Sequence, residues 1–479
     1  MNSERFNTLF LNAYPYEPTK DQVRAIYILS RFIFTPRPRP LYVLKGYAGT
    51  GKTTIVSTLV NLLPGIGQKA VLLAPTGRAA KVLSNYSGQK ASTIHKRIYF
   101  TQTGPDGSLH LKLQANKFKN TVFVVDEASM IHDSSLNANG FSGRSLLEDL
   151  VKYVYNDENC RLILIGDDAQ LPPVGTDESP ALNVEWLKRS FSLTAGMGEM
   201  KEVVRQARES GILMNATALR RQQEASIPEL PFFHLNDFSD IVCVPGYDLQ
   251  EALETAFNSS DSDTEAVMIT RSNKRANRFN QEIRNRILFR ENKIDAGDRL
   301  MVVKNNYFWL DDKTEAGFIA NGDMIEVLSL NGYEKLHGFD YANATIRMPD
   351  YPGMQAFDVM LMLDTLESES PSLTQQQQRE RYNAFMQDFS YLNTKQEKQK
   401  VLKKNPLFNA LQVKFGYALT CHKTQGGQWK YVFVDQGYIT EDTIDTSYLR
   451  WLYTAITRAT EKLFLVNFRE EFFSGTHNG

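Results

Sequence analysis

Short apolar runs alternate with polar, helix-forming stretches along the N-terminal part of the chain. The runs are rich in β-branched and aromatic residues, which favours buried strands. They lie at residues 41–44, 69–75, 121–125 and 161–165. A helix is expected at 22–34, with Thr19 as its N-cap. Strands separated in this way predict an α/β fold with a parallel, doubly wound sheet, whose ligands lie at the carboxyl ends of the strands.

The C-terminal part repeats this pattern. Apolar runs at 266–270, 416–420, 431–434 and 462–466 are expected to be strands, and 273–286 a helix, giving a second α/β core that is split in sequence. Between its halves, alternating segments and turns at 298–363 indicate a small β-barrel, and the polar stretch 367–406 indicates solvated helices. The expected domains are a first core at 1–97 and 119–195 with a hairpin at 98–118, and a second core at 196–297 and 411–479 with an insertion at 298–410.

The composition fits a globular chain, with 42% apolar and 23% charged residues. No apolar run approaches the roughly 18–20 residues that cross a bilayer, and the N-terminus lacks the features of a secretion signal. Cys160, Cys243 and Cys421 are far apart and not in metal-ligand spacing, which predicts a reducing compartment, the cytoplasm. The lack of a long apolar run predicts no membrane partner. The net charge of −1 neither supports nor excludes a nucleic-acid partner, so that question depends on local residues.

The clearest candidate chemistry follows the first strand, where GYAGTGKTT occupies residues 46–54. A strand, a glycine-rich loop and a helix form the setting in which the pattern G-x-x-x-x-G-K-[ST] binds phosphates through backbone N–H groups. Lys52 is expected to reach the β- and γ-phosphates of ATP, and the Thr53 hydroxyl to ligate Mg²⁺. The flanking elements disfavour the alternative, a glycine-rich turn without a ligand. The predicted nucleotide-binding residues are Gly46, Ala48, Gly49, Thr50, Gly51, Lys52, Thr53 and Thr54.

Four further polar residues extend this site. Asp126 and Glu127 follow a buried-type strand, so Asp126 is expected to hold Mg²⁺ and Glu127 to polarise the attacking water. Gln170, at the mouth of the next strand, could sense the γ-phosphate by hydrogen bonding. Gln22 could read an adenine edge, although a glutamine there is more often a solvated helix residue.

Two helix starts are candidates for gripping a phosphate backbone, because N–H groups, hydroxyls and basic side chains bind phosphates without reading bases. Ordinary caps on surface helices are an equal alternative. The turn at 103–107 predicts a hairpin, whose Tyr99 and Phe100 could stack on bases or pack at its root. The candidates at the helix starts are Pro75, Thr76, Gly77 and Arg78, and then Thr93 and His95.

In order and over nearly the full length, these segments resemble those of superfamily 1 helicases of the 5′→3′ branch, which includes the phage Dda helicase and RecD-like proteins. The resemblance implies two RecA-like P-loop NTPase cores with the nucleotide between them. It also implies that the hairpin is a pin that splits duplex, and that the insertion is an SH3-like β-barrel with a helical tower near 370–405. The matching segments are GYAGTGKTT (46–54), APTGRAAK (74–81), VVDEAS (124–129), IGDDAQLPPV (165–174), EVVRQAR (202–208), ALTCHKTQGGQW (418–429) and YTAITRAT (453–460).

The same resemblance implies roles for residues of the second core. Arg205 and Arg458, the latter at a helix start, would reach the γ-phosphate, a role that suits an always-charged, forked guanidinium. The remaining implied contacts are Gln425 and Gly427 at the nucleotide cleft, and Thr420, His422 and Lys423 on single-stranded DNA.

The implied function is an ATP- and Mg²⁺-dependent DNA helicase that moves 5′→3′ on single-stranded DNA and opens duplex at junctions, in repair, recombination or replication. A monomer is expected, working with single-strand-binding or repair proteins. Two alternatives stay open: a DNA-dependent ATPase or translocase that unwinds poorly, and an ATP-switched regulatory subunit of a repair complex. The presence of both Glu127 and Arg458 argues against a pure switch, because a switch in which hydrolysis is incidental does not need both.

Overall fold

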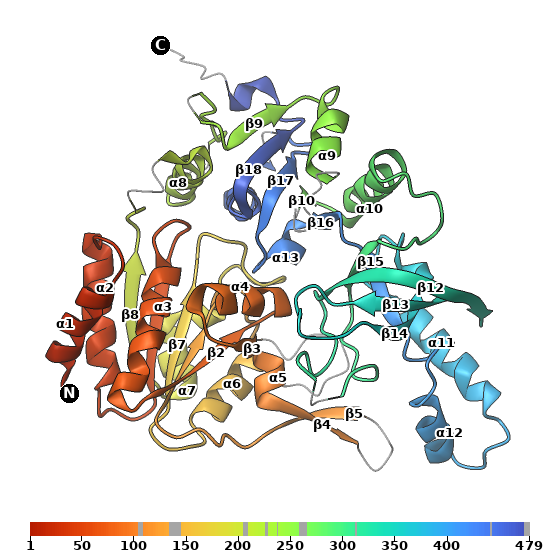
Figure 1. Cartoon of the computed structure of the whole chain (residues 1–479), viewed down its shortest axis with the longest axis horizontal. Coiled ribbons are helices and arrows are strands. Elements are labelled where there is room, and N and C mark those ends of the chain that lie inside the picture. Colours follow the sequence, from red (N-terminus) through yellow and green to blue (C-terminus); the bar gives the residue numbers. More distant parts are fainter. Residues whose placement is uncertain are drawn as a thin grey trace.

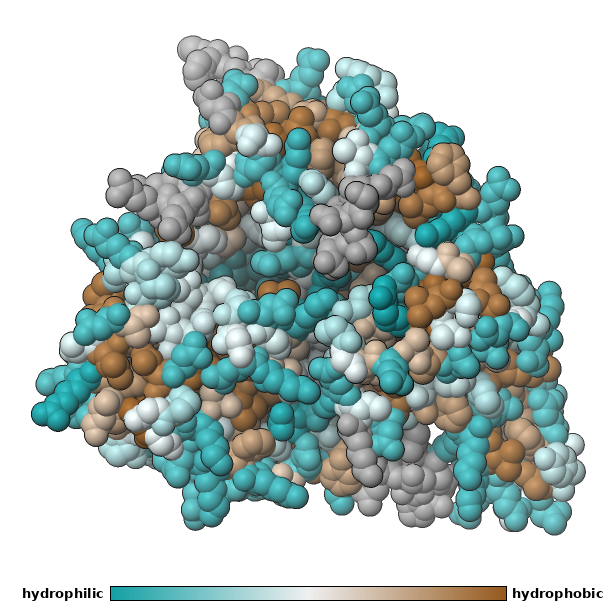
Figure 2. All heavy atoms as spheres, viewed as in Figure 1, coloured by the Kyte–Doolittle hydropathy of each residue, from teal (hydrophilic) through white to brown (hydrophobic). Residues whose placement is uncertain are grey.

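Two parallel α/β cores and a β-barrel make up the molecule, seen at lower left, top and right in Figure 1. The computed structural model describes residues 1–103, 109–133, 145–204, 209–225, 229–236, 238–257, 266–311, 314–440 and 443–473. No helix within these ranges is long and apolar enough to span a membrane. Hydrophilic residues predominate on the face shown in Figure 2, and the hydrophobic ones on it form separate groups.

The first core is a six-stranded sheet in the order β3-β2-β6-β7-β1-β8, with every neighbouring pair parallel. The four predicted strands are present, and the short β3 and the glycine-containing β8 are additions. Because β8 pairs with β1 as far as Met200, the first sheet continues past the expected boundary at 195. The strands are β1 (Pro40–Gly46), β2 (Lys69–Ala74), β3 (Ala91–Thr93), β6 (Thr121–Val125), β7 (Arg161–Gly166) and β8 (Thr194–Met200).

Helices cover both faces of this sheet because side chains alternate along each buried strand. Tyr42 and Leu44 of β1 pack in one cluster with helices α1, α2 and α3, whereas Leu41 and Val43 pack in another with α6 and α7. The expected N-cap Thr19 forms a capping box that begins α2. The helices are α1 (Ser3–Ala13), α2 (Lys20–Ile33), α3 (Lys52–Leu62), α4 (Gly77–Ser87), α5 (Ile94–Ile98), α6 (Leu146–Val154) and α7 (Val184–Phe191).

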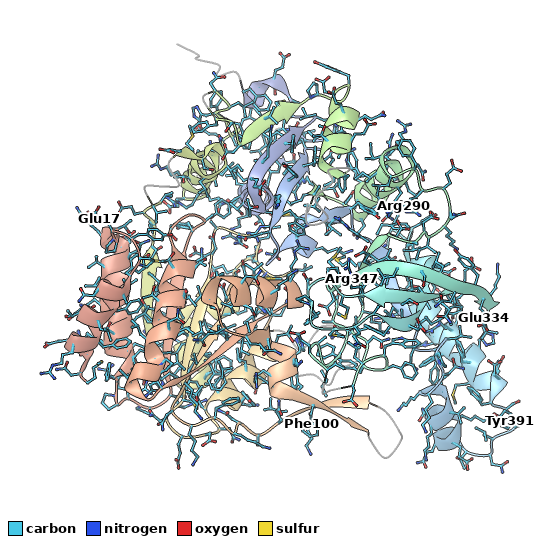
Figure 3. The ribbon with its side chains drawn as sticks, in the orientation of Figure 1. Glu17, Phe100, Arg290, Glu334, Arg347 and Tyr391 are labelled. Atoms are coloured by element: carbon cyan, nitrogen blue, oxygen red, sulfur yellow. The ribbon has the colours of Figure 1, made fainter. Side chains whose placement is uncertain are left out.

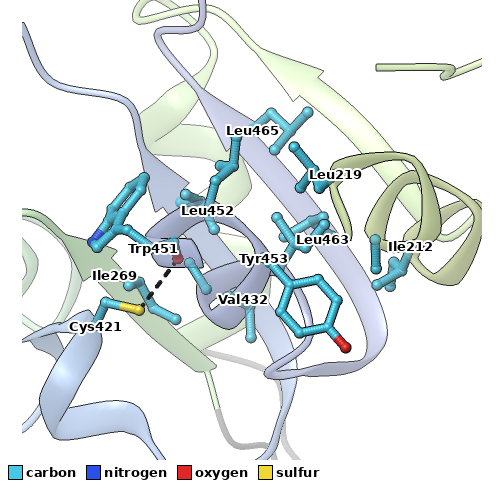
Figure 4. Packing of buried hydrophobic residues seen from close by; sticks show 14 of the residues in the cluster. Ile212, Leu219, Ile269, Cys421, Val432, Trp451, Leu452, Tyr453, Leu463 and Leu465 are labelled. Atoms are coloured by element: carbon cyan, nitrogen blue, oxygen red, sulfur yellow. Dashed lines mark hydrogen bonds between the residues drawn. The ribbon is translucent and has the colours of Figure 1, made fainter. Parts of the chain in front are cut away.

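The second core is a parallel five-stranded sheet in the order β16-β10-β17-β18-β9. Aliphatic and aromatic side chains of α8, α14 and the sheet form its core, part of which is drawn in Figure 4. The strands are β9 (Ile241–Val244), β10 (Ala266–Thr270), β16 (Ala418–Thr420), β17 (Trp429–Asp435) and β18 (Ala459–Val466). The helices include α8 (Gly211–Gln223), α9 (Leu249–Phe257), α10 (Asn273–Glu282), α13 (Cys421–Thr424) and α14 (Thr446–Ile456).

The insertion contains the predicted small barrel, which closes in the order β11-β12-β13-β14-β15. Its last strand, β15, lies beyond the expected end of the insertion at 410, because it pairs with β11 and β14. Helices α11 (Gln375–Asp388) and α12 (Lys395–Leu402) extend from the barrel (Figure 1). The barrel strands are β11 (Arg299–Val302), β12 (Met324–Leu336), β13 (Phe339–Arg347), β14 (Phe357–Met362) and β15 (Leu411–Phe415).

The predicted hairpin consists of β4 (Tyr99–Thr103) and β5 (Leu109–Leu113), paired antiparallel and extending from the first core (Figure 1). Phe100 is 40% exposed and lies on the outer side of the hairpin (Figure 3). Tyr99 instead points to its root, where its hydroxyl donates to Asp149 Oδ2 over 2.8 Å. Of the two aromatic candidates, only Phe100 therefore presents a free face to a base.

Candidate nucleotide and nucleic-acid site

The phosphate-binding loop joins the end of β1 to the start of α3. Gly49 and Gly51 have φ angles of 73° and 85°, which glycine adopts without strain. A Cβ atom on Gly51 would lie 2.4 Å from Gln22 Nε2, so this position also needs the absence of a side chain. The loop therefore turns its backbone toward the N-terminal end of α3, where N–H groups bind anions.

Lys52 lies at the centre of this loop. Its Nζ donates to the backbone oxygens of Gly46 and, over 2.9 Å, of Tyr47. The Thr53 side chain, the predicted Mg²⁺ ligand, is exposed. An ammonium held only by neutral carbonyls can turn to phosphate oxygens, which bind it more strongly.

A cavity of about 720 Å³ opens above the loop, a size typical of nucleotide and ligand pockets. Both cores contribute to its walls. The lining residues that the sequence had singled out are Ala48, Gly49, Gly51, Lys52, Thr53, Asp126, Glu127, Gln170 and Arg458. The structure thus brings the predicted phosphate, acid and arginine groups together, although Arg458 is about 400 residues from the loop.

Asp126 and Glu127 follow β6 at the floor of this cavity. Asp126 Oδ2 accepts the Tyr86 hydroxyl, and its Oδ1 accepts the Glu127 N–H over 2.9 Å. Glu127 has a left-handed backbone with φ 51°, a strained conformation for a residue other than glycine. Burial raises the pKa of the Glu127 carboxyl, and the Arg458 guanidinium opposes that rise.

Arg458 faces Glu127 from the second core, with Nη1 4.0 Å from Glu127 Oε1. The expectation that it lies at a helix start is wrong, because α14 ends at Ile456 and Thr457 caps it. The side chain is 4% exposed and donates to the backbone oxygens of Thr454 and Gly427. Its guanidinium is therefore held in place at the cavity wall. The other predicted arginine, Arg205, lies outside the described residues.

The three predicted glutamines differ in their surroundings. Gln170 is 6% exposed, lines the cavity, and its Oε1 has no hydrogen-bond partner among the described residues, as expected of a group that awaits a ligand or water. Gln22 is 1% exposed, which excludes the solvated alternative. Its amide accepts from Thr19 N and donates to Thr50 O, each over 2.9 Å, so in this structure it braces the phosphate-binding loop. Gln425 donates to Leu171 O over 2.6 Å and thereby joins the two cores.

Tyr453 and Asp167 are functional candidates that the sequence analysis missed. The Tyr453 hydroxyl, from α14 of the second core, accepts from Ala48 N over 2.9 Å and donates to Asp167 Oδ2 over 2.6 Å. Both residues belong to segments already matched to helicase motifs, at 453–460 and 165–174. Their place in these two motifs could have indicated a role from the sequence alone. The contact between Tyr453 and Asp167 is seen only in the structure.

On the first core, Thr76 and Thr93 are the predicted N-caps of α4 and α5. Their hydroxyls accept from Ala79 N and Lys96 N, each over 3.2 Å. The residues around them are engaged across domains. Arg78 donates to Gln428 O over 2.9 Å and stacks on Trp429, with 3.9 Å from its Cζ to the ring centroid. This arginine links the two cores instead of standing free at the helix start.

Loops of the barrel lie directly over this surface of the first core. Lys81 Nζ is 3.5 Å from Asp350 Oδ1, and Lys96 donates to the backbone of Thr314 over 2.8 Å and of Glu315. A Cβ atom on Gly77 would lie 2.5 Å from Asp323 Oδ1 and would collide with it. A cavity of about 790 Å³ remains between these loops and the two caps.

The second-core candidates lie where β16 passes into α13. Thr420 is the N-cap residue, His422 is exposed, and Lys423 approaches Asn273 Oδ1 at 3.5 Å. Burial and the charge of Lys414 lower the pKa of Lys423 to about 8. On the first core, burial lowers the pKa of His95 to about 4, so this histidine is neutral at pH 7. Of the three second-core candidates, His422 is exposed, whereas Thr420 and Lys423 are partly buried.

Known proteins share both cores. Residues 33–234 match the family model of an AAA domain, and residues 415–466 match that of a UvrD-like helicase C-terminal domain. The ATP-dependent RecD2 DNA helicase of Deinococcus radiodurans is 32% identical over 179 residues, 37% of this chain and 21% of that protein. The ATP-dependent DNA helicase dda of Enterobacteria phage T4 is 33% identical over 141 residues, 29% of each chain.

The matched segments thus span less than a third of the length of these two relatives. Among solved structures, the Pif1 helicase from Bacteroides in complex with ADP-AlF3 and ssDNA is 16% identical. It aligns over 96% of this chain and 95% of its own length, with a TM-score of 0.48.

Proposed function

We propose that this chain is a superfamily 1 helicase of the RecD and Dda group, and that it is an ATP-dependent DNA helicase that moves 5′→3′ on single-stranded DNA. The matched family models and relatives support this proposal. One observation carries the proposal. Lys52, Glu127 and Arg458 meet in one cavity although the first two belong to one core and the third to the other. Such a cavity changes shape when the cores move, so nucleotide chemistry and core movement are linked.

The residues fit MgATP. Thr53 and Asp126 would hold Mg²⁺ with water completing its shell, since this ion usually keeps several waters. When bound, the ion neutralises charge on the phosphates. Lys52 would exchange the Gly46 and Tyr47 carbonyls for phosphate oxygens. The unpartnered Gln170 Oε1 supports a position beside the attacking water or the γ-phosphate.

In the proposed reaction Glu127 accepts the proton of the attacking water, and it must be ionised to do so. Its partial burial opposes ionisation, whereas Arg458 favours it. Arg458 would therefore serve twice, by keeping Glu127 ionised and by stabilising the charge that develops on the transferred phosphoryl group. Closing the cleft brings these groups together, and opening it separates them.

Single-stranded DNA would lie along Thr76 and Thr93 on the first core and along Thr420 and His422 on the second. Cap hydroxyls and exposed donors at helix starts suit a phosphate backbone. Phe100, exposed on the hairpin, would stack on a base at the duplex junction. Arg78, Lys423 and His95 are engaged or inward, so they are proposed only as supports of this path.

Several finer features belong to the same proposal. They are an SH3-like character of the barrel, a tower formed by α11 and α12, action as a monomer with single-strand-binding or repair proteins, and a cytoplasmic location. The three cysteines are free thiols, which fits a reducing compartment. We also propose that Arg205 contacts the γ-phosphate and that Gln425 and Gly427 lie at the nucleotide cleft. For Gln425, the bond to Leu171 favours a role in coupling the two cores over direct contact with the nucleotide.

A forked duplex tests the proposal. The substrate carries a 5′ single-stranded tail, and strand separation is followed by fluorescence with ATP, without ATP, and on a matched 3′-tailed fork. ATP-dependent separation of the 5′-tailed fork alone is the expected result. Separation from the 3′ tail alone would reverse the polarity, and DNA-stimulated hydrolysis without separation would favour the translocase alternative.

A further inference from the structure

The hydroxyl of Tyr453 connects the second core to two segments of the first. The Tyr453 ring is 1% exposed and packs with Ile212 and Leu463 in the hydrophobic core of the second domain. Figure 4 shows its hydroxyl at the edge of this cluster, pointing away from the aliphatic side chains. There it accepts from Ala48 N over 2.9 Å and donates to Asp167 Oδ2 over 2.6 Å.

These two partners both line the nucleotide cavity. Ala48 belongs to the phosphate-binding loop, and Asp167 follows directly after β7. Asp167 is 1% exposed, and its other oxygen accepts from Ala169 N over 3.0 Å. A buried carboxylate and a buried N–H are each costly to leave without a hydrogen-bond partner. One hydroxyl thus fixes the loop, Asp167 and α14 relative to one another.

The neighbouring contacts extend this connection toward the proposed DNA site. Thr454, next on α14, accepts from Leu171 N over 2.8 Å, and Gln425 donates to Leu171 O over 2.6 Å. The segment 167–171 is therefore held at both ends by the second core. Gln425 directly follows α13, which carries His422. Hydrogen bonds, joined by the short chain segments 167–171 and 422–425, thus connect the phosphate-binding loop to the segment proposed to hold DNA.

We infer that Tyr453 is a positioning residue that couples the nucleotide cavity to the DNA-facing segment of the second core. It holds α14, and with it Arg458, in register with the phosphate-binding loop, and it holds 167–171 against Gln425. The inference rests on the proposed helicase function. Tyr453 acts through Ala48, Asp167 and Arg458, and without its hydroxyl the two sites bind their ligands more independently of each other.

The test compares Tyr453→Phe with Tyr42→Phe in the full chain. Tyr42 is a matched control because its hydroxyl is also buried but has no hydrogen-bond partner in the described part of the chain. The dissociation constant of a labelled single-stranded oligonucleotide is measured by anisotropy with and without a non-hydrolysable ATP analogue and Mg²⁺. The ratio of the two constants is the coupling, and the active fraction of the preparation cancels in it.

Coupling of this kind is typically about 5–150-fold, and Tyr453→Phe is expected to bring the ratio at least about fivefold closer to one. Tyr42→Phe is expected to keep the ratio of the unaltered chain. DNA-stimulated kcat should fall in Tyr453→Phe with a smaller change in the KM for ATP, because Arg458 loses its register more than the loop loses phosphate contacts. Thermal melting confirms that both variants are folded, and Thr454→Val, which removes the next bond along α14, should change the ratio in the same direction.

A Tyr453→Phe ratio within about twofold of the unaltered chain would overturn the inference, since typical coupling is larger than that. An equal loss in Tyr42→Phe would also overturn it, because the effect would then not depend on the cross-core bond. Failure of the proposed function looks different: the unaltered chain itself would show no DNA-stimulated ATP hydrolysis. An unaltered chain that hydrolyses ATP on DNA but has a ratio of one refutes the coupling role alone.

Discussion

Replacement of Arg458 tests the proposed cleft chemistry most directly. Arg458 is 4% exposed, lies 4.0 Å from Glu127 and is fixed by the Thr454 and Gly427 carbonyls. Arginines that reach a γ-phosphate are worth about 10³–10⁵ in kcat. Because each tenfold step equals about 1.4 kcal/mol, Arg458→Ala should raise the barrier by about 4–7 kcal/mol. Arg458→Lys keeps the charge but loses the planar fork, so we expect an intermediate loss.

The pH dependence separates the two roles of this arginine. Burial raises the pKa of Glu127, and the positive charge of Arg458 lowers it. In Arg458→Ala the lowering influence disappears, so the pKa of Glu127 rises further. A base that must be ionised then requires a higher pH, and the acid limb of the kcat profile moves to higher pH. In Arg458→Lys the charge remains, and the acid limb should move less although kcat has fallen.

The measurement is ATP hydrolysis at saturating ATP and single-stranded DNA across about pH 5 to 9, the range in which a perturbed carboxyl base is seen. Arg469→Ala serves as the control, because Arg469 also lies in the second core but pairs with the exposed Glu471. An Arg458→Ala protein with kcat within about tenfold of the unaltered chain would refute the γ-phosphate role. An unmoved acid limb would refute the electrostatic support of Glu127.

Three further variants test the loop, the core–barrel junction and the barrel. Lys52→Ala should abolish ATP hydrolysis and leave single-stranded DNA binding intact in an anisotropy assay; retained turnover would contradict the role of Lys52. Asp298→Ala should lower the free energy of unfolding in urea by about 3–5 kcal/mol, because it removes the buried carboxylate that Arg284 and Arg290 share and leaves the 3%-exposed Arg284 side chain with the partly exposed Asp295 as its remaining carboxylate. Glu326→Ala, at the more exposed pair with Arg347, should cost about 1 kcal/mol or less. Burial raises the pKa of Asp323 to about 8. Between about pH 4 and 8, Asp323 therefore keeps its proton in the folded chain but releases it in the unfolded chain. The free energy of unfolding consequently falls as the pH rises through this range. Asp323→Asn should therefore melt with a smaller difference between pH 5 and pH 8 than the unaltered chain, and an unchanged difference would show that Asp323 is ionised when folded.

The sequence predicted the location of the candidate residues well where they follow buried parallel strands. Apolar runs such as 121–125 and 161–165 are long enough to identify strands, and the carboxyl ends of parallel strands necessarily meet at one edge. Asp126 and Gln170 could therefore be assigned to one site without coordinates. β8 was missed because its sequence, TAGMGEM, has two glycines and little hydrophobic pattern, and β9 because it has only four residues.

Contacts between the cores could not be predicted in this way. Tyr453 and Asp167 are 286 residues apart, and nothing in a local pattern states that a tyrosine hydroxyl will meet a particular carboxylate. The prediction that Arg458 lies at a helix start was wrong because α14 ends at Ile456, with Thr457 as its C-cap. Gln22 was judged by its polarity, whereas its capping box and its bond to Thr50 decide its burial.

The barrel adds a constraint on the proposed DNA path that neither core imposes alone. If a single strand lies along Thr76 and Thr93, its phosphates come close to the basic side chains of α4 and α5, which include Lys81 and Lys96. In this structure both lysines are engaged by barrel loops, and Asp323 packs against Gly77 at the start of α4. The Asp350 carboxylate that pairs with Lys81 repels a phosphate, so a bound strand and this contact exclude one another wherever they overlap. If DNA follows this path, the barrel loops have to move away from Lys81 and Lys96 before these side chains can bind its phosphates.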